Sequence, residues 1–221
     1  MPSLLFACLS VLRTAVGMSR VLAAQRWRNN AEMIVDVAKL WYRAGDRVLD
    51  PTYGDGKWWT LFQPKKFVHS DLLDGVDVRY LPHRARSFDV VAFDPPYVST
   101  GGRDTSTLPA FQAAYGLKGA PKSPRALQDD LIRPGLQEAH RVLRPDGRVW
   151  VKCMNYVSSG ALFLGVTETV MDAWECGFEV VDEFIYVGNA GPQPKKNLDG
   201  SERRQVHAAH NASVLLVLRK R

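Results

Sequence analysis

The stretch from Ser87 to Asp94 constrains the fold more than any other part of the sequence. Its middle is almost entirely apolar, which is typical of a strand buried on both faces of a parallel sheet. The run ends in the residues Asp94, Pro95, Pro96 and Tyr97. A buried strand is therefore followed at once by a carboxylate, a rigid turn and an aromatic ring.

A second run of the same kind, from Arg47 to Asp50, also ends in an aspartate and leads into a glycine turn. Apolar spacing predicts further strands over 67–71, 76–78, 148–153, 178–187 and 212–218, and helices over 30–43, 57–62, 126–143 and 161–176. Strands that alternate with helices favour a doubly wound, mostly parallel α/β sheet. Ligands of such sheets bind outside the carboxyl ends of the strands, and both aspartates lie there.

The length of 221 residues, with 46% hydrophobic and 24% charged residues, fits one globular domain with a sizeable core. We expect a single domain over 30–221 with an inserted segment over 98–127, preceded by an N-terminal extension over 1–29. The apolar start of the extension is interrupted by Arg13 and is too short to span a bilayer. The three cysteines, Cys8, Cys153 and Cys176, are far apart and odd in number, which indicates a reduced, cytoplasmic setting.

The net charge of +6 is concentrated in two segments. The segment 98–127 carries four basic residues and one acidic residue, and the segment from Tyr186 to the end carries seven and two. Basic side chains interleaved with Phe111 and Tyr115 suit contact with a nucleic-acid backbone and its bases. The same composition is also typical of a packed lid, for the first segment, or of a solvated basic tail, for the second. The candidate nucleic-acid-binding residues are Arg103, Lys118, Lys122, Lys195, Lys196, Arg203 and Arg204, with Arg125 in the first of the two segments.

The glycine turn after Asp50 is a candidate cofactor site. Glycines let the backbone approach a ligand closely, and a following helix N-terminus favours a negative group. The turn is neither a GxGxxG dinucleotide motif nor a phosphate loop with its lysine. Its candidate ligand-binding residues are Asp50, Pro51, Thr52, Tyr53, Gly54 and Gly56. Asp71, at the end of the next predicted strand, is placed to accept hydrogen bonds from ribose hydroxyls, and Asp77 follows; both could instead cap a turn.

The order of these motifs resembles a known family. Val48-Leu49-Asp50-Pro51 with Gly54 and Gly56, followed downstream by Asp94-Pro95-Pro96-Tyr97, looks like the S-adenosylmethionine-dependent amino-methyltransferases that modify adenine N6 or cytosine N4 in DNA. The resemblance runs from about residue 30 to the end. It implies a Rossmann-like class I sheet of seven strands, the last two forming an antiparallel hairpin.

The resemblance also implies residue roles. The turn of Asp50, Gly54 and Gly56 would wrap the methionine part of S-adenosylmethionine, Asp71 would hold its ribose, and Asp77 could face its adenine. Asp77 follows Asp71 by only six positions, which leaves no room for the usual crossover helix. The chain also lacks a segment large enough for a separate target-recognition domain.

The residues after the buried strand suit methyl transfer to an amine. An aromatic exocyclic amine is a poor nucleophile because its lone pair is delocalised into the ring. Asp94 and the carbonyl of Pro95, held by the fixed backbone of two prolines, would accept its two N–H groups. Tyr97 would stack on the base, and a base inside a duplex would first be flipped out. Adenine N6 in DNA is the leading target.

Other functions stay open on the sequence, among them a methyltransferase for protein glutamine or a small amine, which would not need the basic C-terminal segment. Similar tetrapeptides occur in enzymes that methylate the exocyclic amine of guanine in structured RNA, so an RNA base is the first alternative. A non-catalytic nucleic-acid-binding module with the same fold is the second. His207, His210 and Cys153 match no zinc spacing, so we expect no metal. We expect no membrane partner, and the sequence leaves the oligomeric state open.

Overall fold

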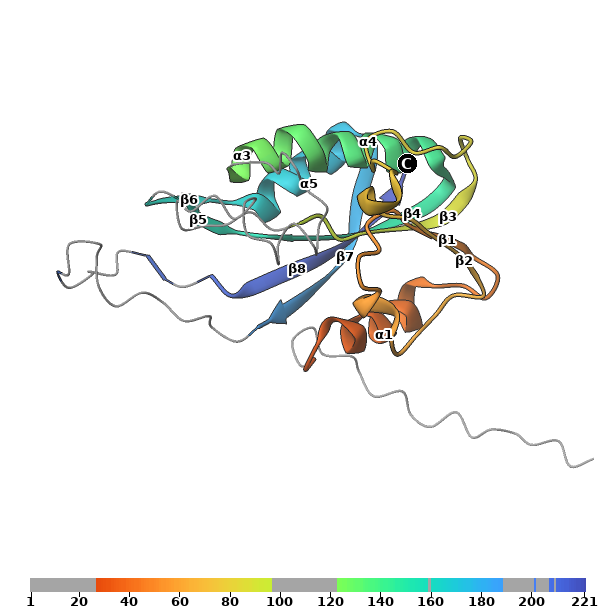
Figure 1. The fold of residues 1–221 in the computed structure, drawn as a ribbon, viewed down its shortest axis with the longest axis horizontal. Coiled ribbons are helices and arrows are strands. Elements are labelled where there is room, and N and C mark those ends of the chain that lie inside the picture. The colour runs from red at the N-terminus through yellow and green to blue at the C-terminus, as the bar shows by residue number, and fades with distance from the viewer. Residues whose placement is uncertain (1–26, 97–122, 159, 189–200, 202–206, 209) are drawn as a thin grey trace, which may run out of the picture.

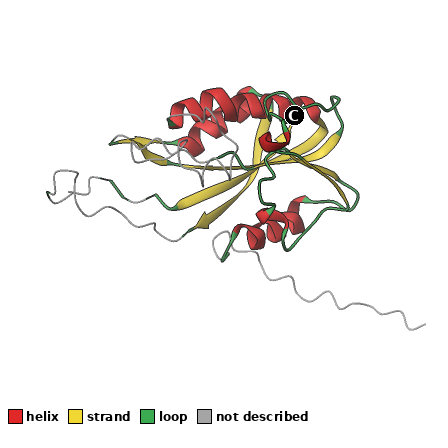
Figure 2. Ribbon diagram, in the orientation of Figure 1, coloured by secondary structure: helices red, strands yellow, loops and turns green. Residues whose placement is uncertain are grey.

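The computed structural model describes residues 27–96, 123–158, 160–188, 201, 207–208 and 210–221. Within these residues the chain forms a six-stranded sheet in the order β2-β1-β3-β4-β8-β7 and a separate two-stranded hairpin of β5 and β6. Helix α1 covers one face of the sheet, and α4 and α5 cover the other (Figure 1). The two layers of helices around one sheet are also visible in Figure 2.

The strands are β1 (Arg47–Asp50), β2 (Lys66–His69), β3 (Phe88–Phe93), β4 (Leu143–Met154), β5 (Tyr156–Ser158), β6 (Ala161–Phe163), β7 (Phe178–Val187) and β8 (Ala212–Lys220). The α-helices are α1 (Asn30–Trp41), α3 (Pro124–Leu127), α4 (Arg133–Val142) and α5 (Gly165–Glu175). Two 3₁₀ turns, η1 (Lys57–Trp59) and η2 (Leu72–Asp74), follow β1 and β2, and a π-helical turn, η4 (Gln128–Ile132), joins α3 to α4.

The first four strands of the sheet are parallel to one another, β8 runs in the opposite direction, and β7 pairs antiparallel with β8. Strand β1 pairs in parallel with β2 and β3, and β3 pairs in parallel with β4. Strand β8 pairs antiparallel with β4 and with β7. The expected doubly wound, mostly parallel sheet with a C-terminal antiparallel pair is therefore confirmed.

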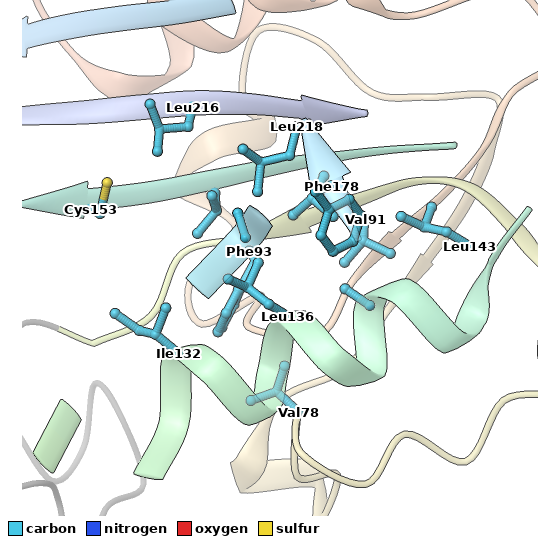
Figure 3. Packing of buried hydrophobic residues seen from close by; sticks show 14 of the residues in the cluster. Val78, Val91, Phe93, Ile132, Leu136, Leu143, Cys153, Phe178, Leu216 and Leu218 are labelled. Carbon is cyan, nitrogen blue, oxygen red and sulfur yellow. The ribbon is translucent and has the colours of Figure 1, made fainter. Parts of the chain in front are cut away.

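Alternation along the strands divides the core into two layers. Val91, Phe93 and Val149 face α4 and α5, whereas Val90 and Trp150 face α1. Figure 3 shows the first layer, with Ile132 and Leu136 directed at the sheet. The fully buried residues of β3 explain why it reads as a continuous apolar run.

Helix α4 packs closely against β3 because Gly135 has no side chain. A Cβ atom at Gly135 would lie 2.7 Å from the ring of Phe93. This close approach brings the start of α4, and η4 before it, to the end of β3. Elements that precede the Asp94 motif in the sequence and elements that follow it therefore meet at one edge of the sheet.

The strand expected over 76–78 was wrong. The segment is a loop, since a parallel strand after β2 would need a crossover of about a dozen residues, and η2 ends at Asp74. Side chains of α4 satisfy the loop backbone instead. The Leu81 N–H donates to Glu138 at 3.0 Å, and Arg141 donates to the carbonyls of Leu81 and His83 at 2.9 and 2.8 Å.

Other boundaries also differ from the sequence-based expectation. The helix expected over 57–62 is only the 3₁₀ turn η1, and the strand expected over 148–153 begins at Leu143. The helix expected over 161–176 begins only at Gly165, because residues 161–163 pair with 156–158 in the β5–β6 hairpin. Helix α3 lies at the end of the segment 98–127 that we expected to be inserted, and the rest of that segment up to residue 122 lies outside the described residues. No helix in the described part of the chain combines the length and apolar character needed to cross a membrane.

Candidate active site

A cavity of about 560 Å³ lies at the carboxyl ends of β1, β2 and β3. That volume lies within the range of small-molecule and cofactor sites, roughly 300–1,000 Å³. Residues 50–54 from the glycine turn, Asp71 and Asp77 line one part of it, and Asp94 and Pro96 line another. The structure thus brings the two sequence motifs together at one site, as the strand ends predicted.

Asp50 lies at the floor of this cavity and is almost fully buried. Its carboxylate accepts hydrogen bonds from the Thr52 backbone N–H at 2.9 Å and from the Trp59 indole N–H at 2.6 Å. Burial raises the pKa of Asp50 to about 7, and the nearby Asp94 adds to the rise, while the bonds from Trp59 and Thr52 oppose it. A cationic ligand beside Asp50 would favour its ionised form.

Thr52 connects the two motifs. Its hydroxyl accepts a hydrogen bond from the Asp94 backbone N–H at 2.9 Å and lies 3.4 Å from the Asp50 carboxylate, to which it donates. The start of the second motif is therefore fixed to the first by a side chain. We had placed Thr52 only among the cofactor-binding residues.

The pKa of the Asp94 carboxyl is subject to opposing effects. Burial raises its pKa, while the ammonium group of Lys152 and the indole of Trp58 lower it, and the net direction is upward. Lys152 is itself buried, near the end of β4. Asp94 Oδ1 is buried and has no hydrogen-bond partner within the described residues.

Asp71 and the glycines shape the turn around the cavity. The Asp71 carboxylate accepts the Gly54 N–H at 3.0 Å and, as the cap of η2, the Leu73 N–H at 3.0 Å. Gly54 and Gly56 both have positive φ, a conformation that glycine adopts without cost. Gly56 does not line the cavity; instead the ring of Tyr53 packs over it, where a Cβ would lie 2.5 Å from the Tyr53 hydroxyl.

Asp77 is occupied by a salt bridge with Arg79. The guanidinium contacts both carboxylate oxygens, the shortest contact being 2.6 Å, and lowers the pKa of Asp77. Arg79 also donates to the carbonyl of Asp130 at 3.3 Å. Residue 134, four positions after Asp130, is a proline, so the N–H that an α-helix would direct at this carbonyl is absent. The bond from Arg79 ties η4 to the loop of Asp77.

The cavity wall is strongly acidic. Besides Lys57 and Arg79, the acidic and basic side chains that line it are all aspartates: Asp50, Asp55, Asp71, Asp77, Asp94, Asp129 and Asp130. The two basic residues are each paired with one of these acids, Lys57 with Asp55 at 3.0 Å and Arg79 with Asp77. The remaining carboxylates create a field that favours a positively charged ligand.

Several residues of the candidate site were missed by sequence reasoning. Trp58 and the π-helical residues Asp129, Asp130 and Leu131 line the cavity, and Trp59 binds Asp50. The adjacent tryptophans directly after the glycine turn were a readable signal. The π-helical turn was not, since nothing in the pattern over 126–143 separates it from an α-helix.

The other predicted residues lie either outside the described part of the chain or away from the cavity. Tyr97 and the seven candidate nucleic-acid-binding residues fall outside the described residues. Pro95 is described and buried but does not line the cavity. Arg125, from the basic segment 98–127, forms a bidentate salt bridge with Glu168, with both N···O distances at 2.9 Å. It therefore contributes to packing between α3 and α5. Within the described residues, no three metal-ligating side chains come together.

Comparison with solved structures establishes the fold. A candidate methyltransferase from Bacillus halodurans superposes with a TM-score of 0.53 at 14% identity, over 86% of this chain and 98% of that one. The chain has the Rossmann-like fold of class I methyltransferases. No protein-family model and no curated protein sequence matches it.

Two further similar structures differ in what they are described as acting on. A candidate sarcosine dimethylglycine methyltransferase from Galdieria sulphuraria has a TM-score of 0.49 at 11% identity, over 86% of this chain and 84% of that one. A candidate DNA modification methylase from Thermus thermophilus, crystallised with S-adenosyl-L-methionine, has a TM-score of 0.40 at 14% identity, over 79% of this chain and 53% of that one. The likeness is one of fold and does not choose among substrates.

Proposed function

We propose that this protein is an S-adenosylmethionine-dependent methyltransferase that acts on an exocyclic amine of a nucleic-acid base, with adenine N6 in DNA as the target. The observation that carries the proposal is the single cavity lined by both the Asp50 turn and Asp94. A methyl donor and an acceptor must be adjacent for transfer. Thr52, which bonds to the Asp94 backbone, fixes the two halves of the cavity to one another.

The cavity fits this donor in size and charge. S-adenosylmethionine carries a sulfonium and an ammonium group, and the cavity wall carries aspartates in excess over basic residues. Asp50 and the Gly54 backbone would hold the methionine part, Asp71 the ribose, and the Asp77 loop the adenine. When bound, the cofactor supplies an electrophilic methyl group. The wall residues bind it, orient it and exclude water.

Asp94 would act on the acceptor. Its carboxylate would accept one N–H of the amine, and the Pro95 carbonyl a second, which favours a localised lone pair on nitrogen. Two consecutive prolines fix the backbone on which that carbonyl depends. Asp94 does not have to remove a proton from the amine, so its pKa needs no particular value. The proton can leave to water once the amine has been alkylated.

Identification of the methylated product tests the proposal. The protein would be incubated with methyl-labelled cofactor and with duplex DNA, single-stranded DNA or total RNA, then the nucleic acid digested to nucleosides. We expect label in N6-methyldeoxyadenosine. Asp94→Ala should abolish transfer and leave cofactor affinity nearly unchanged, whereas Asp74→Asn, an exposed residue outside the cavity, should behave as the wild type.

The alternatives predict different products. Label in a ribonucleoside alone would assign the protein to RNA. Cofactor binding without label in any nucleic acid would overturn the proposal and favour a protein or small-amine substrate, or a binding module. Full activity of Asp94→Ala would remove Asp94 from the mechanism.

A further inference from the structure

Two adjacent tryptophans in η1 lie beside the two motif aspartates. Trp59 donates its indole N–H to Asp50 at 2.6 Å. Trp58 lies beside Asp94: the two residues line the same cavity, and the indole lowers the pKa of the Asp94 carboxyl. One short 3₁₀ turn thus carries two consecutive tryptophans that act on two aspartates, one at the end of β1 and one directly after β3.

The two pairs are not equivalent. Trp58 Nε1 and Asp94 Oδ1 are both buried, and within the described residues neither has a hydrogen-bond partner. Trp58 is only 5% exposed, so water cannot readily replace a protein partner. Leaving a buried donor or acceptor unsatisfied costs about 1–3 kcal/mol, and native proteins leave few such groups. Here two such atoms, one donor and one acceptor, belong to two residues that line the same cavity.

Hydrogen bonds of active sites are often long or poorly aligned before the site is filled and become tighter during turnover. We propose that Trp58 is a positioning residue, whose indole N–H donates to Oδ1 of the ionised Asp94 carboxylate and leaves Oδ2 to accept the N–H of the substrate amine. This rests on the proposed function for the role of Asp94, but the indole–carboxylate pairing itself does not.

The surroundings of Asp94 support an oriented carboxylate. Its backbone N–H is fixed by the Thr52 hydroxyl, and Pro95 follows. The charged groups that influence the carboxyl are Lys152 of β4 and the neighbouring Asp50. An indole N–H is a donor only, so it would select the ionised form and fix one oxygen.

Nuclear magnetic resonance tests the pairing without any substrate. The chain has six tryptophans, and the indole signal of Trp58 would be assigned by its loss in Trp58→Phe. We expect this signal to move downfield as Asp94 ionises on raising the pH, and to stop titrating in Asp94→Asn. A Trp58 signal that is independent of pH, or that titrates unchanged in Asp94→Asn, would overturn the inference.

Kinetics then test the role. Trp58→Phe keeps an aromatic ring at this position and removes the indole N–H donor, together with the five-membered part of the ring. We expect a loss in kcat of about ten- to hundredfold, an unchanged KM for the cofactor, and an acid limb of the pH–rate profile at higher pH. The matched variant Trp59→Phe should instead weaken cofactor binding. Wild-type kcat and pH profile in Trp58→Phe would overturn the positioning role, whereas absence of transfer in the wild type would count against the proposed function alone.

Discussion

Replacing Asp50 with asparagine should make the protein more stable at neutral pH. Burial raises the pKa of Asp50 from its ordinary value of 3.8 to about 7. The folded chain therefore binds a proton more tightly at this site than the unfolded chain does. Below the unfolded value both forms are protonated and burial of the charge costs nothing; above the folded value both are ionised and the cost is complete.

The magnitude follows from the two pKa values. A difference of about three pH units, at about 1.4 kcal/mol each, corresponds to about 4 kcal/mol of lost stability. The loss accumulates as the pH rises from about 4 to about 7. Asparagine carries no charge, so the variant does not suffer this loss of stability. The exchange also weakens the hydrogen bonds from Thr52 and Trp59, by an amount that does not vary with pH.

Urea unfolding of the wild type and Asp50→Asn at a series of pH values measures the effect. The free energy of unfolding of the variant, relative to the wild type, should rise by up to about 1.4 kcal/mol per pH unit across this window and then level off. Asp77→Asn is the matched control. Arg79 lowers the pKa of Asp77, so its loss should cost stability above the unfolded pKa and the difference should have the opposite sign. A difference between the wild type and Asp50→Asn that is independent of pH would refute the buried, proton-binding carboxyl.

Three further perturbations test the site. Thr52→Val removes the acceptor of the amide that follows β3 and should cost about 1–3 kcal/mol in urea unfolding; Thr52→Ser should restore most of it, and equal stability of all three proteins would contradict the link. Asp71→Ala removes a carboxylate that holds two backbone amides and should weaken S-adenosylhomocysteine binding by at least about tenfold in calorimetry, with unchanged affinity counting against that role. Gly56→Ala should be destabilised by more than the roughly 1–2 kcal/mol of a left-handed residue, because its Cβ would strike Tyr53, whereas Gly45→Ala meets no neighbour and should show the conformational cost alone in thermal unfolding.

Most of the fold could be predicted from the sequence because its strands are buried and regular. The continuous apolar run of β3 and the aspartates at the ends of β1 and β3 fixed a parallel sheet and the edge at which a ligand binds. The short spacing from Asp71 to Asp77 also indicated that the strand expected over 76–78 had no room for its crossover. The interactions that replace it, from Glu138 and Arg141, connect segments more than fifty residues apart and leave no local pattern.

The candidate site was predicted less completely, for a similar reason. Motif aspartates and glycines are recognisable because their positions in the turn restrict the residue type. Trp58 lowers the pKa of Asp94, which lies on a different element of the chain, and a tryptophan in an apolar sequence is ordinarily a core residue. The π-helical turn depends on how Pro134 interrupts the hydrogen bonds of α4, so Asp129 and Asp130 acquire their place only once the chain has folded.

A crystal structure with S-adenosylhomocysteine tests the central claim most directly. We predict that the ligand fills the cavity at the ends of β1, β2 and β3, with its thioether sulfur directed toward Asp94. Binding elsewhere, or a sulfur facing away from that carboxylate with no path for an amine between them, would contradict the account.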